Sequence, residues 1–288
     1  MNLANLPSRV QLIDVGPRDG LQNEKQPVPA EVKIGLVHRL QAAGLTEIEV
    51  TSFVSPKWVP QMADNAVVMA GIERQSGVRY SVLTPNMVGY QAAVASKPDE
   101  IVVFGAASQA FSQKNINCSI EESMERFAPV VQAALAAGIA VRGAMSCTVG
   151  CPYEGEVSPA SVAHLAGLMK QIGVQRVDVA DTIGTGTPLK VQKAIGAALQ
   201  HFDIDHICGH FHDTYGRACG TFSRRWRVWA VALMPRAPRA TWPPKTWSTC
   251  CTAWALRRAL IWTNWWMQAR SSATFWAANP TRTWPRPC

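Results

Sequence analysis

The feature that most constrains the fold is an alternation of short β-rich runs and amphipathic helical segments through the first 216 residues. The runs recur at intervals of roughly 30 residues, the length of a strand–helix–strand unit. They are Val10–Val15, Glu47–Phe53, Arg79–Leu83, Glu100–Phe104, Ala140–Met145, Arg176–Ala180 and His206–His210. Helix signals stand between them, because Ser119 with Glu122 forms a capping box and Gly173 is a stop signal. The alternation predicts a parallel sheet built from βα units.

The position of polar residues separates a closed barrel from an open sheet. An open doubly wound sheet shows the same alternation, but no G-x-G-x-x-G motif follows the first run. Polar residues instead gather in or just after several runs, as a barrel requires when it builds one site from separate strands. They are Asp14, Arg18, Asp19, Glu49, Asp181, His210, His212 and Asp213. We therefore predict an α/β fold, a (β/α)8 TIM barrel, with residues 1–216 as its catalytic domain and source of strands one to seven.

A candidate metal site comes from the sequence His210-Phe211-His212. On an extended strand, residues two apart point to the same side, so both imidazoles can reach one cation. Asp19, after the first run, can add an oxygen ligand. A mixed nitrogen and oxygen set suits Mg2+ or Mn2+ better than a structural zinc. The alternative is a pair of surface histidines at a strand end.

Three further charged residues are candidates for the chemistry. Arg18 is a cation beside the predicted metal site that can hold a carboxylate or a developing enolate oxygen. Glu49 lies inside an apolar run, and its burial is costly unless it is paired. A role in the site and a pair with Arg18 both remain open. Asp178 and Asp181 cannot both face the core freely, and Asp181 is favoured for the site because it is nearer the strand end.

Residues 217–288 differ sharply in composition from the rest of the chain. They contain 11 Arg, one Lys, no acidic residue and ten of the 11 Trp, whereas residues 1–216 carry a net charge of −4. A basic aromatic segment can bind nucleic acid, but we expect no specific nucleic-acid partner, for the reason given below. No apolar run approaches the roughly 18 residues of a membrane span, and no signal pattern opens the chain. We expect a cytoplasmic protein without a membrane partner and with reduced thiols.

Four motifs carry a resemblance to a known enzyme family. In one-letter code they are D-V-G-P-R-D-G-L-Q-N-E at 14–24, T-S-F-V-S-P-K-W-V-P-Q-M-A-D at 51–64, S-C through G-C-P-Y-E-G at 146–155 and G-H-F-H-D-T-Y-G at 209–216. With their spacing, residues 9–216 resemble the hydroxymethylglutaryl-CoA lyases. Related Claisen-type synthases share only the R-D-G and H-x-H elements, so the long second motif favours a lyase. A synthase of the same superfamily is the alternative enzyme.

The resemblance implies a reaction and roles for particular residues. It implies retro-Claisen cleavage of 3-hydroxy-3-methylglutaryl-CoA to acetoacetate and acetyl-CoA, a step of leucine catabolism and ketone-body formation. Asp19, His210 and His212 would ligate a divalent metal, and Arg18 would steady the acetyl-CoA enolate. Glu49 and Asp181 would orient the substrate hydroxyl or its base, and Gln22 with Arg18 would bind the acyl-CoA substrate. The family also suggests a homodimer.

The resemblance stops near residue 217. The family pattern leads us to expect a G-x-G-G-C-P-Y loop with an acid cysteine, and then an asparagine ligand in G-N-V-A, but neither is present in 217–288. Codons for a family-like V-V-Y-L-L-H-G-L-G, read one base late, give W-S-T-C-C-T-A-W, the sequence from Trp247 to Trp254. Codons for L-D-K-L-V-D-A-G similarly give the sequence from Trp262 to Gln268. We interpret 217–288 as an aberrant, out-of-frame tail that is irregular, with a deletion of the cysteine loop as a further possibility.

This interpretation has consequences for stability and activity. No eighth strand is evident in the sequence, so strands one and seven are expected to expose unpaired edges, an aggregation hazard. We expect poor stability, weak metal binding and impaired lyase activity. A non-catalytic remnant with an adhesive basic tail is the alternative outside enzymes.

Overall fold

The computed structural model describes residues 11–212, residue 214 and residues 229–231. The chain divides into two compact units, Met1–Ala240 and Thr241–Cys288. All described residues belong to the first unit. The predicted aberrant tail lies outside the described residues except for 229–231, so its irregularity and its boundary at 217 remain predictions.

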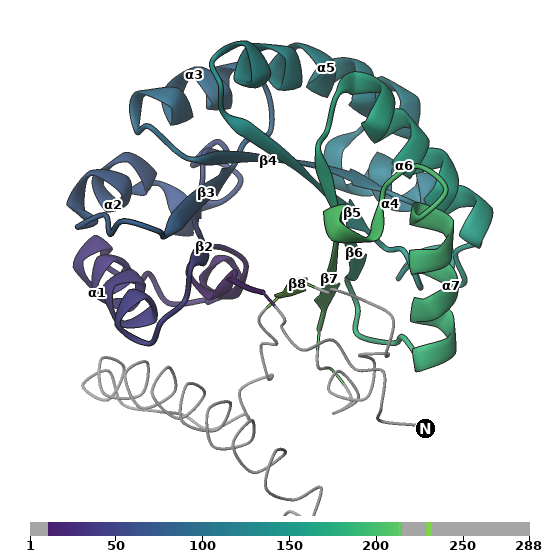
Figure 1. The fold of residues 1–288 in the computed structure, drawn as a ribbon, viewed down its shortest axis with the longest axis horizontal. Helices are drawn as coiled ribbons and strands as arrows, with labels where there is room; N and C mark the ends of the chain where they lie inside the picture. Colours follow the sequence, from purple (N-terminus) through teal and green to yellow (C-terminus); the bar gives the residue numbers. More distant parts are fainter. Residues whose placement is uncertain (1–10, 213, 215–228, 232–288) are drawn as a thin grey trace, which may run out of the picture. The chain divides into compact units, whose positions relative to one another are not determined.

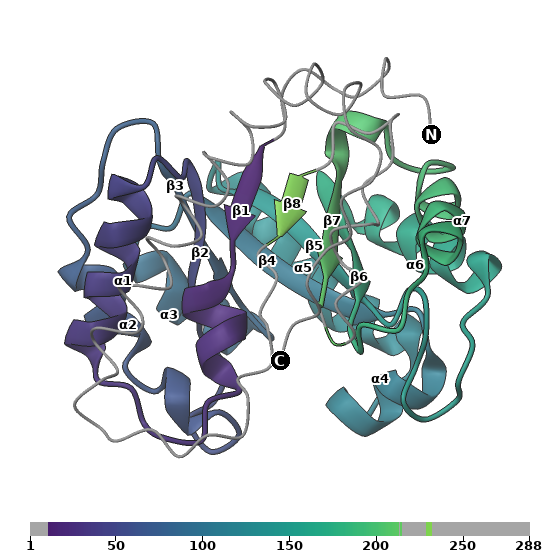
Figure 2. The ribbon, with the colours of Figure 1, turned by 90° about the horizontal axis from the view of Figure 1, so that it is seen from below.

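Eight parallel strands form a closed barrel in chain order, which confirms the predicted fold class (Figure 1 and Figure 2). The strands are β1 (Leu12–Asp14), β2 (Glu47–Ser52), β3 (Arg79–Leu83), β4 (Glu100–Ala106), β5 (Ala140–Ser146), β6 (Arg176–Asp181), β7 (Ile207–Phe211) and β8 (Trp229–Val231). The register of β2 and β3 shifts between Glu49 and Thr51, which marks a bulge beside the predicted site residue Glu49.

Within the residues that the structure describes, seven α-helices lie outside the barrel of strands (Figure 1). They are α1 (Ala30–Ala42), α2 (Asn65–Gly71), α3 (Met87–Ala95), α4 (Gln109–Ile116), α5 (Ile120–Ala136), α6 (Pro159–Ile172) and α7 (Pro188–Ala198). The predicted capping box of Ser119 and Glu122 opens α5, and Gly173 ends α6 with φ of 103°. None of the helices in the described part of the chain is long and apolar enough to cross a membrane.

The eighth strand corrects one prediction. Trp229–Val231 pairs in parallel with β7 on one side and with β1 on the other, so the expectation that strands one and seven keep unpaired edges is wrong. The pairing is brief, with Leu12↔Ala230 and Ile13↔Val231 against β1, and Cys208↔Trp229 and Gly209↔Ala230 against β7. Backbone amides and carbonyls make these ladders, so almost any residue can supply them. A strand that is held by backbone pairing therefore leaves no side-chain motif in the sequence.

Charged side chains occupy much of the barrel interior. Glu47 and Glu49 on β2, Glu100 on β4, Arg142 on β5, and Arg176 and Asp178 on β6 are each at most 6% exposed. Barrel interiors are more often filled by branched apolar residues. Buried charges persist only when they are paired. One of these side chains, Glu49, is paired with Arg18 of the candidate site.

Candidate metal and substrate site

Asp19 is presented by a tight turn that follows β1. The turn, η2 (Gly16–Gly20), is a short π-helix in which the amides of Arg18, Asp19 and Gly20 all donate to the carbonyl of Val15, at 3.2, 2.7 and 3.3 Å. Gly16 permits the turn, because a Cβ at this position would lie 2.9 Å from Oδ1 of Asp14. The turn therefore holds Arg18 and Asp19 at the carboxyl end of the first strand.

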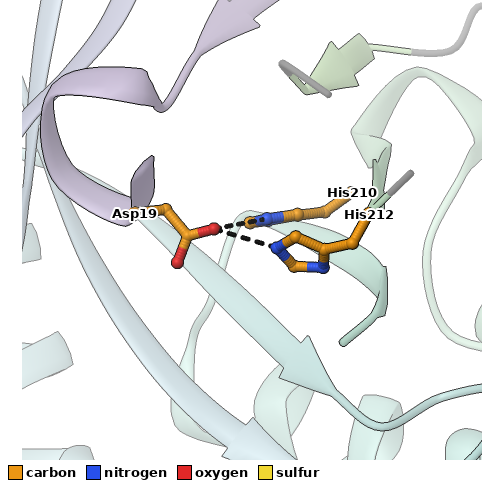
Figure 3. Close-up of side chains that lie close together, drawn as sticks. All are labelled: Asp19, His210 and His212. Atoms are coloured by element: carbon orange, nitrogen blue, oxygen red, sulfur yellow. Dashed lines mark hydrogen bonds and ion pairs between the residues drawn. The ribbon is translucent and has the colours of Figure 1, made fainter. Parts of the chain in front are cut away.

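His210 and His212 come from β7 and the residue after it, and they meet Asp19 as the sequence predicted (Figure 3). Oδ2 of Asp19 lies 3.0 Å from Nε2 of His212 and 3.4 Å from Nε2 of His210. One potential ligand atom from each of the three residues lies within 4.8 Å of the others. Strands β1 and β7 are separated by β8 in the barrel, so the cluster spans the point where the barrel closes.

The chemistry of the three side chains fits a divalent cation. Nε2 of His210 is buried and has no hydrogen-bond partner among the described residues, as expected for a nitrogen that ligates a metal. Nδ1 of His212 lies 2.9 Å from the backbone carbonyl oxygen of Asp181, a contact that directs Nε2 toward Asp19. Such an outer partner is typical of metal-binding histidines. Two nitrogens and a carboxylate oxygen make a site that could hold a metal ion.

Electrostatics keeps Asp19 ionised. Burial acts to raise the pKa of Asp19, but the positive charge of Arg18 and the close contacts with His210 and His212 hold it well below its usual value. For His212, burial acts to lower the pKa, and the hydrogen bond and charge of Asp19 outweigh burial and raise it. The cluster thus offers a fixed anion with two imidazoles, an arrangement that attracts a cation.

Arg18 connects the cluster to Glu49, which confirms the predicted pair between these two residues. Nε of Arg18 donates to Oε1 of Glu49, and Nη1 donates to Oδ1 of Asp19 at 2.8 Å. Burial acts to raise the pKa of Glu49, but Arg18 and Arg142 together lower it below its usual value. Glu49 is therefore paired with Arg18 and ionised beside the cluster, which confirms one of the two readings, and its role in the chemistry stays a prediction.

Asp181 and Gln22 lie near the cluster but make different contacts. Oδ2 of Asp181 accepts from the amide of Gly186 at 2.7 Å, and Oδ1 accepts from the amide of Thr185 at 3.2 Å. Burial raises the pKa of Asp181 despite these hydrogen bonds. The side chain thus orders the loop after β6, while its backbone carbonyl orients His212. Gln22 is half-buried just after η2. The catalytic role of Asp181 and the substrate contact of Gln22 remain predictions, and Asp213 lies outside the described residues.

Arg142, which was not predicted from the sequence, lies at the centre of the buried charges. Its side chain has no exposed surface, and its guanidinium contacts Glu49, Glu100 and Asp178. Burial acts to lower the pKa of Arg142, but these three carboxylates hold it well above its usual value. The signal was present, because Arg142 stands inside the apolar run 140–145, as Glu49 stands inside its own run.

Comparisons with known proteins agree with this geometry. The HMGL-like family model matches residues 9–223. The mitochondrial hydroxymethylglutaryl-CoA lyase of Bos taurus is 52% identical over 217 residues, which cover 75% of this chain and 67% of the relative. A 3-hydroxy-3-isohexenylglutaryl-CoA/hydroxy-methylglutaryl-CoA lyase of Pseudomonas aeruginosa is 54% identical over 214 residues, covering 74% of this chain and 71% of the relative.

A solved structure shows the same fold. The hydroxymethylglutaryl-CoA lyase from Pseudomonas aeruginosa superimposes with a TM-score of 0.77 and 50% sequence identity, covering 80% of this chain and 77% of that one. Matches in sequence motifs, in barrel architecture and over most of the chain confirm the resemblance inferred from the four motifs. The chain belongs to the HMGL-like family.

Proposed function

We propose that this chain is a carbon–carbon lyase that cleaves 3-hydroxy-3-methylglutaryl-CoA to acetoacetate and acetyl-CoA. The observation that carries the proposal is the cluster of Asp19, His210 and His212 at the carboxyl end of the barrel, with Arg18 against it. It occurs in a chain about half identical to proteins named hydroxymethylglutaryl-CoA lyases. We further propose that the cluster holds Mg2+ or Mn2+.

The reaction needs three events at the site. A base takes the proton of the tertiary hydroxyl, and the bond between the carbinol carbon and the methylene carbon next to the thioester carbonyl breaks. The electron pair of that bond passes to the acetyl-CoA fragment as an enolate, which then accepts a proton. A bound divalent cation would supply Lewis acidity, which stabilises negative charge on the substrate oxygen.

Residues of this chain account for binding and orientation. Arg18 uses Nε for Glu49 and Nη1 for Asp19, so its guanidinium is fixed before the substrate arrives. A fixed cation can stabilise an enolate oxygen without reorganising during the reaction. Each oxygen of Glu49 contacts an arginine, so Glu49 supports Arg18. We keep Asp181 as the candidate that orients the substrate hydroxyl or its base.

Protonation of the enolate is the step that this chain is least equipped to perform. The acid cysteine loop and the asparagine ligand expected from the family pattern are absent from residues 217–288. The family match ends at residue 223, close to the proposed change of reading frame. Loss of a positioned general acid lowers a rate by about 10² to 10⁴. We therefore propose that this chain is an impaired lyase and that a frame-corrected chain has full activity.

The test compares the chain with its frame-corrected counterpart. Both are purified and incubated with 3-hydroxy-3-methylglutaryl-CoA and Mg2+ or Mn2+, and acetoacetate is measured. We expect turnover by the corrected protein and a rate about 10² to 10⁴ lower for this chain. Near-normal turnover by this chain would disprove the impairment. Failure of the corrected protein to form acetoacetate would disprove the lyase function.

The alternative reaction, the location, the oligomeric state and the change of reading frame each have a simple test. Condensation of acetyl-CoA with a 2-oxo acid, followed as release of free thiol, would reveal a synthase in place of the lyase. Cell fractionation tests the cytoplasmic location, and sedimentation tests the homodimer. Resequencing the gene across codons 205–245 tests the change of reading frame directly.

A further inference from the structure

A continuous series of charged contacts leads from the barrel interior to the metal site. It begins at Arg142 on β5, whose Nη2 donates to Oε2 of Glu49 at 2.5 Å. The other oxygen of Glu49 accepts from Nε of Arg18. Nη1 of Arg18 then donates to Oδ1 of Asp19 at 2.8 Å, while Oδ2 of Asp19 faces the two histidines. We call Arg142, Glu49, Arg18 and Asp19 the relay.

Arg142 is held firmly at the inner end of the relay. Nε of Arg142 donates to Oε2 of Glu100 at 3.0 Å, and Nη1 donates to Asp178. The side chain is fully buried. A planar guanidinium bound along three directions has little freedom to rotate. Its position is therefore set by β4 and β6 as well as by its own strand.

Because Glu49 is shared between two arginines, only one of its carboxylate oxygens contacts Arg18. A carboxylate with one arginine available tends to form a bidentate pair that uses both oxygens. Here Arg142 occupies Oε2, so Arg18 receives only Oε1. Without Arg142, the guanidinium of Arg18 can turn to engage both oxygens of Glu49, and Nη1 can then leave Asp19. Asp19 would lose the contact that fixes its Oδ1 and keeps Oδ2 toward the histidines.

We propose that Arg142 is a positioning residue that sets the divalent-cation affinity of the cluster through Glu49 and Arg18. The inference rests on the proposed function, in which Asp19, His210 and His212 hold the cation. Arg142 itself touches neither the cation nor the substrate in this scheme. Its effect on the cluster passes through the relay.

The test measures Mn2+ binding to the full chain by calorimetry, with urea unfolding as a parallel measure of stability. Arg142→Lys keeps the charge but loses the planar fork, and the dissociation constant for Mn2+ is expected to rise about 10- to 100-fold, the range found for outer-shell partners. Glu49→Gln should give a similar rise. The double variant should bind no more weakly than Glu49→Gln alone, because both changes break the same relay. Additive losses would overturn the inference.

Glu47→Gln is the matched control. Glu47 lies two residues before Glu49 on β2, is 4% exposed, and pairs with Arg176 at 2.7 Å. Its loss should destabilise the barrel interior but leave the dissociation constant for Mn2+ within about twofold, since it stands outside the relay. An equal loss of affinity in Glu47→Gln and Arg142→Lys would show that Arg142 acts only through general stability, and the inference would fail.

Two further measurements keep the inference testable. If Arg142→Lys does not fold, Asp178→Asn loosens Arg142 while retaining it, and a smaller rise in the dissociation constant is expected. An unchanged constant would overturn the inference. If the unaltered chain does not bind Mn2+, the proposed metal site fails. The relay is then tested without metal, because urea midpoints of Arg18→Lys, Arg142→Lys and the double variant should be non-additive if both arginines share Glu49.

Discussion

Two regions of the barrel are built very differently. The arc, strands β2–β6, has long pairings such as Glu100↔Ala140 through Ala106↔Ser146. The seam, strands β7, β8 and β1, closes through β8, which pairs at only two positions with each neighbour. The arc also holds most of the buried charges, whereas the candidate metal cluster joins the turn after β1 to the end of β7 across the seam. We therefore expect the arc to supply most of the stability and the seam, with its short pairings, to open more easily.

Breaking the arc should have the largest effect. Arg142→Met leaves Glu49, Glu100 and Asp178 buried without their shared cation. Removing one partner from a buried ion network costs about 3 to 5 kcal/mol, and urea unfolding measures the change. Arg74→Met is the control, because Arg74 pairs with Asp99 at the surface and should contribute at most about 1 kcal/mol. Equal losses would show that the buried charges do not stabilise the arc.

A divalent cation should strengthen the seam. A ligand that binds only the folded state at 100 times its dissociation constant adds about 2.7 kcal/mol. We expect Mn2+ to raise the melting temperature and to slow hydrogen exchange of β1 and β7 amides more than those of β4 and β5. His210→Ala should abolish both effects. Uniform protection of arc and seam would contradict the view that the cation joins the two edges.

A smaller loss of stability is expected when the backbone pairing of β8 is disrupted. Ala230→Pro removes a backbone donor between β7 and β1, and the loss should be about 1 kcal/mol, the net contribution of one hydrogen bond. Ala230→Gly keeps the donor and is the control. Calorimetric melting measures both variants. A loss of several kcal/mol would mean that the seam is as cooperative as the arc.

The smallest expected effect is on the pH dependence of stability, through an ion pair on the outer face of the arc. Glu121 on α5 pairs with His164 on α6 at 2.9 Å, and hydrogen bonds from His164 and nearby groups lower the pKa of Glu121 to about 2. A lowered folded-state pKa stabilises the protein above the unfolded value of about 4.5. That contribution is lost as the pH falls from about 4.5 through about 2.

Glu121→Gln tests this dependence. The variant should show a flatter decline of melting temperature between pH 4.5 and pH 2 than the unaltered chain, and no difference in slope at neutral pH. The pair is half exposed, so the effect is small. If the melting temperature of both proteins falls equally between pH 4.5 and pH 2, the Glu121–His164 pair does not contribute to the stability of the arc.

Local sequence patterns predicted most of the strands and the N-terminal cap of α5 accurately. The run Arg79–Leu83 is β3 as predicted, and Ser119 with Glu122 caps α5 by contacts between neighbours in sequence. The meeting of Asp19, His210 and His212 was also predictable, because H-x-H on a strand and an acidic residue after another strand follow from alternation and barrel geometry. Arg142 was overlooked because its partners come from three other strands, and no local pattern names them. The eighth strand was overlooked because backbone pairing needs no particular side chain.

The sequence by itself determined the βα alternation, the family and the identity of the candidate metal ligands, since each depends on residue types at fixed spacing. The change in composition after residue 216 is likewise visible in the sequence alone, whereas the boundary at 217 stays a prediction. Only the tertiary structure decided that Glu49 is shared by Arg18 and Arg142, that Asp178 faces inward while Asp181 binds loop amides, and that three residues close the barrel. The physical reason is that buried charges and strand edges are satisfied by partners distant in the chain, which only folding brings together.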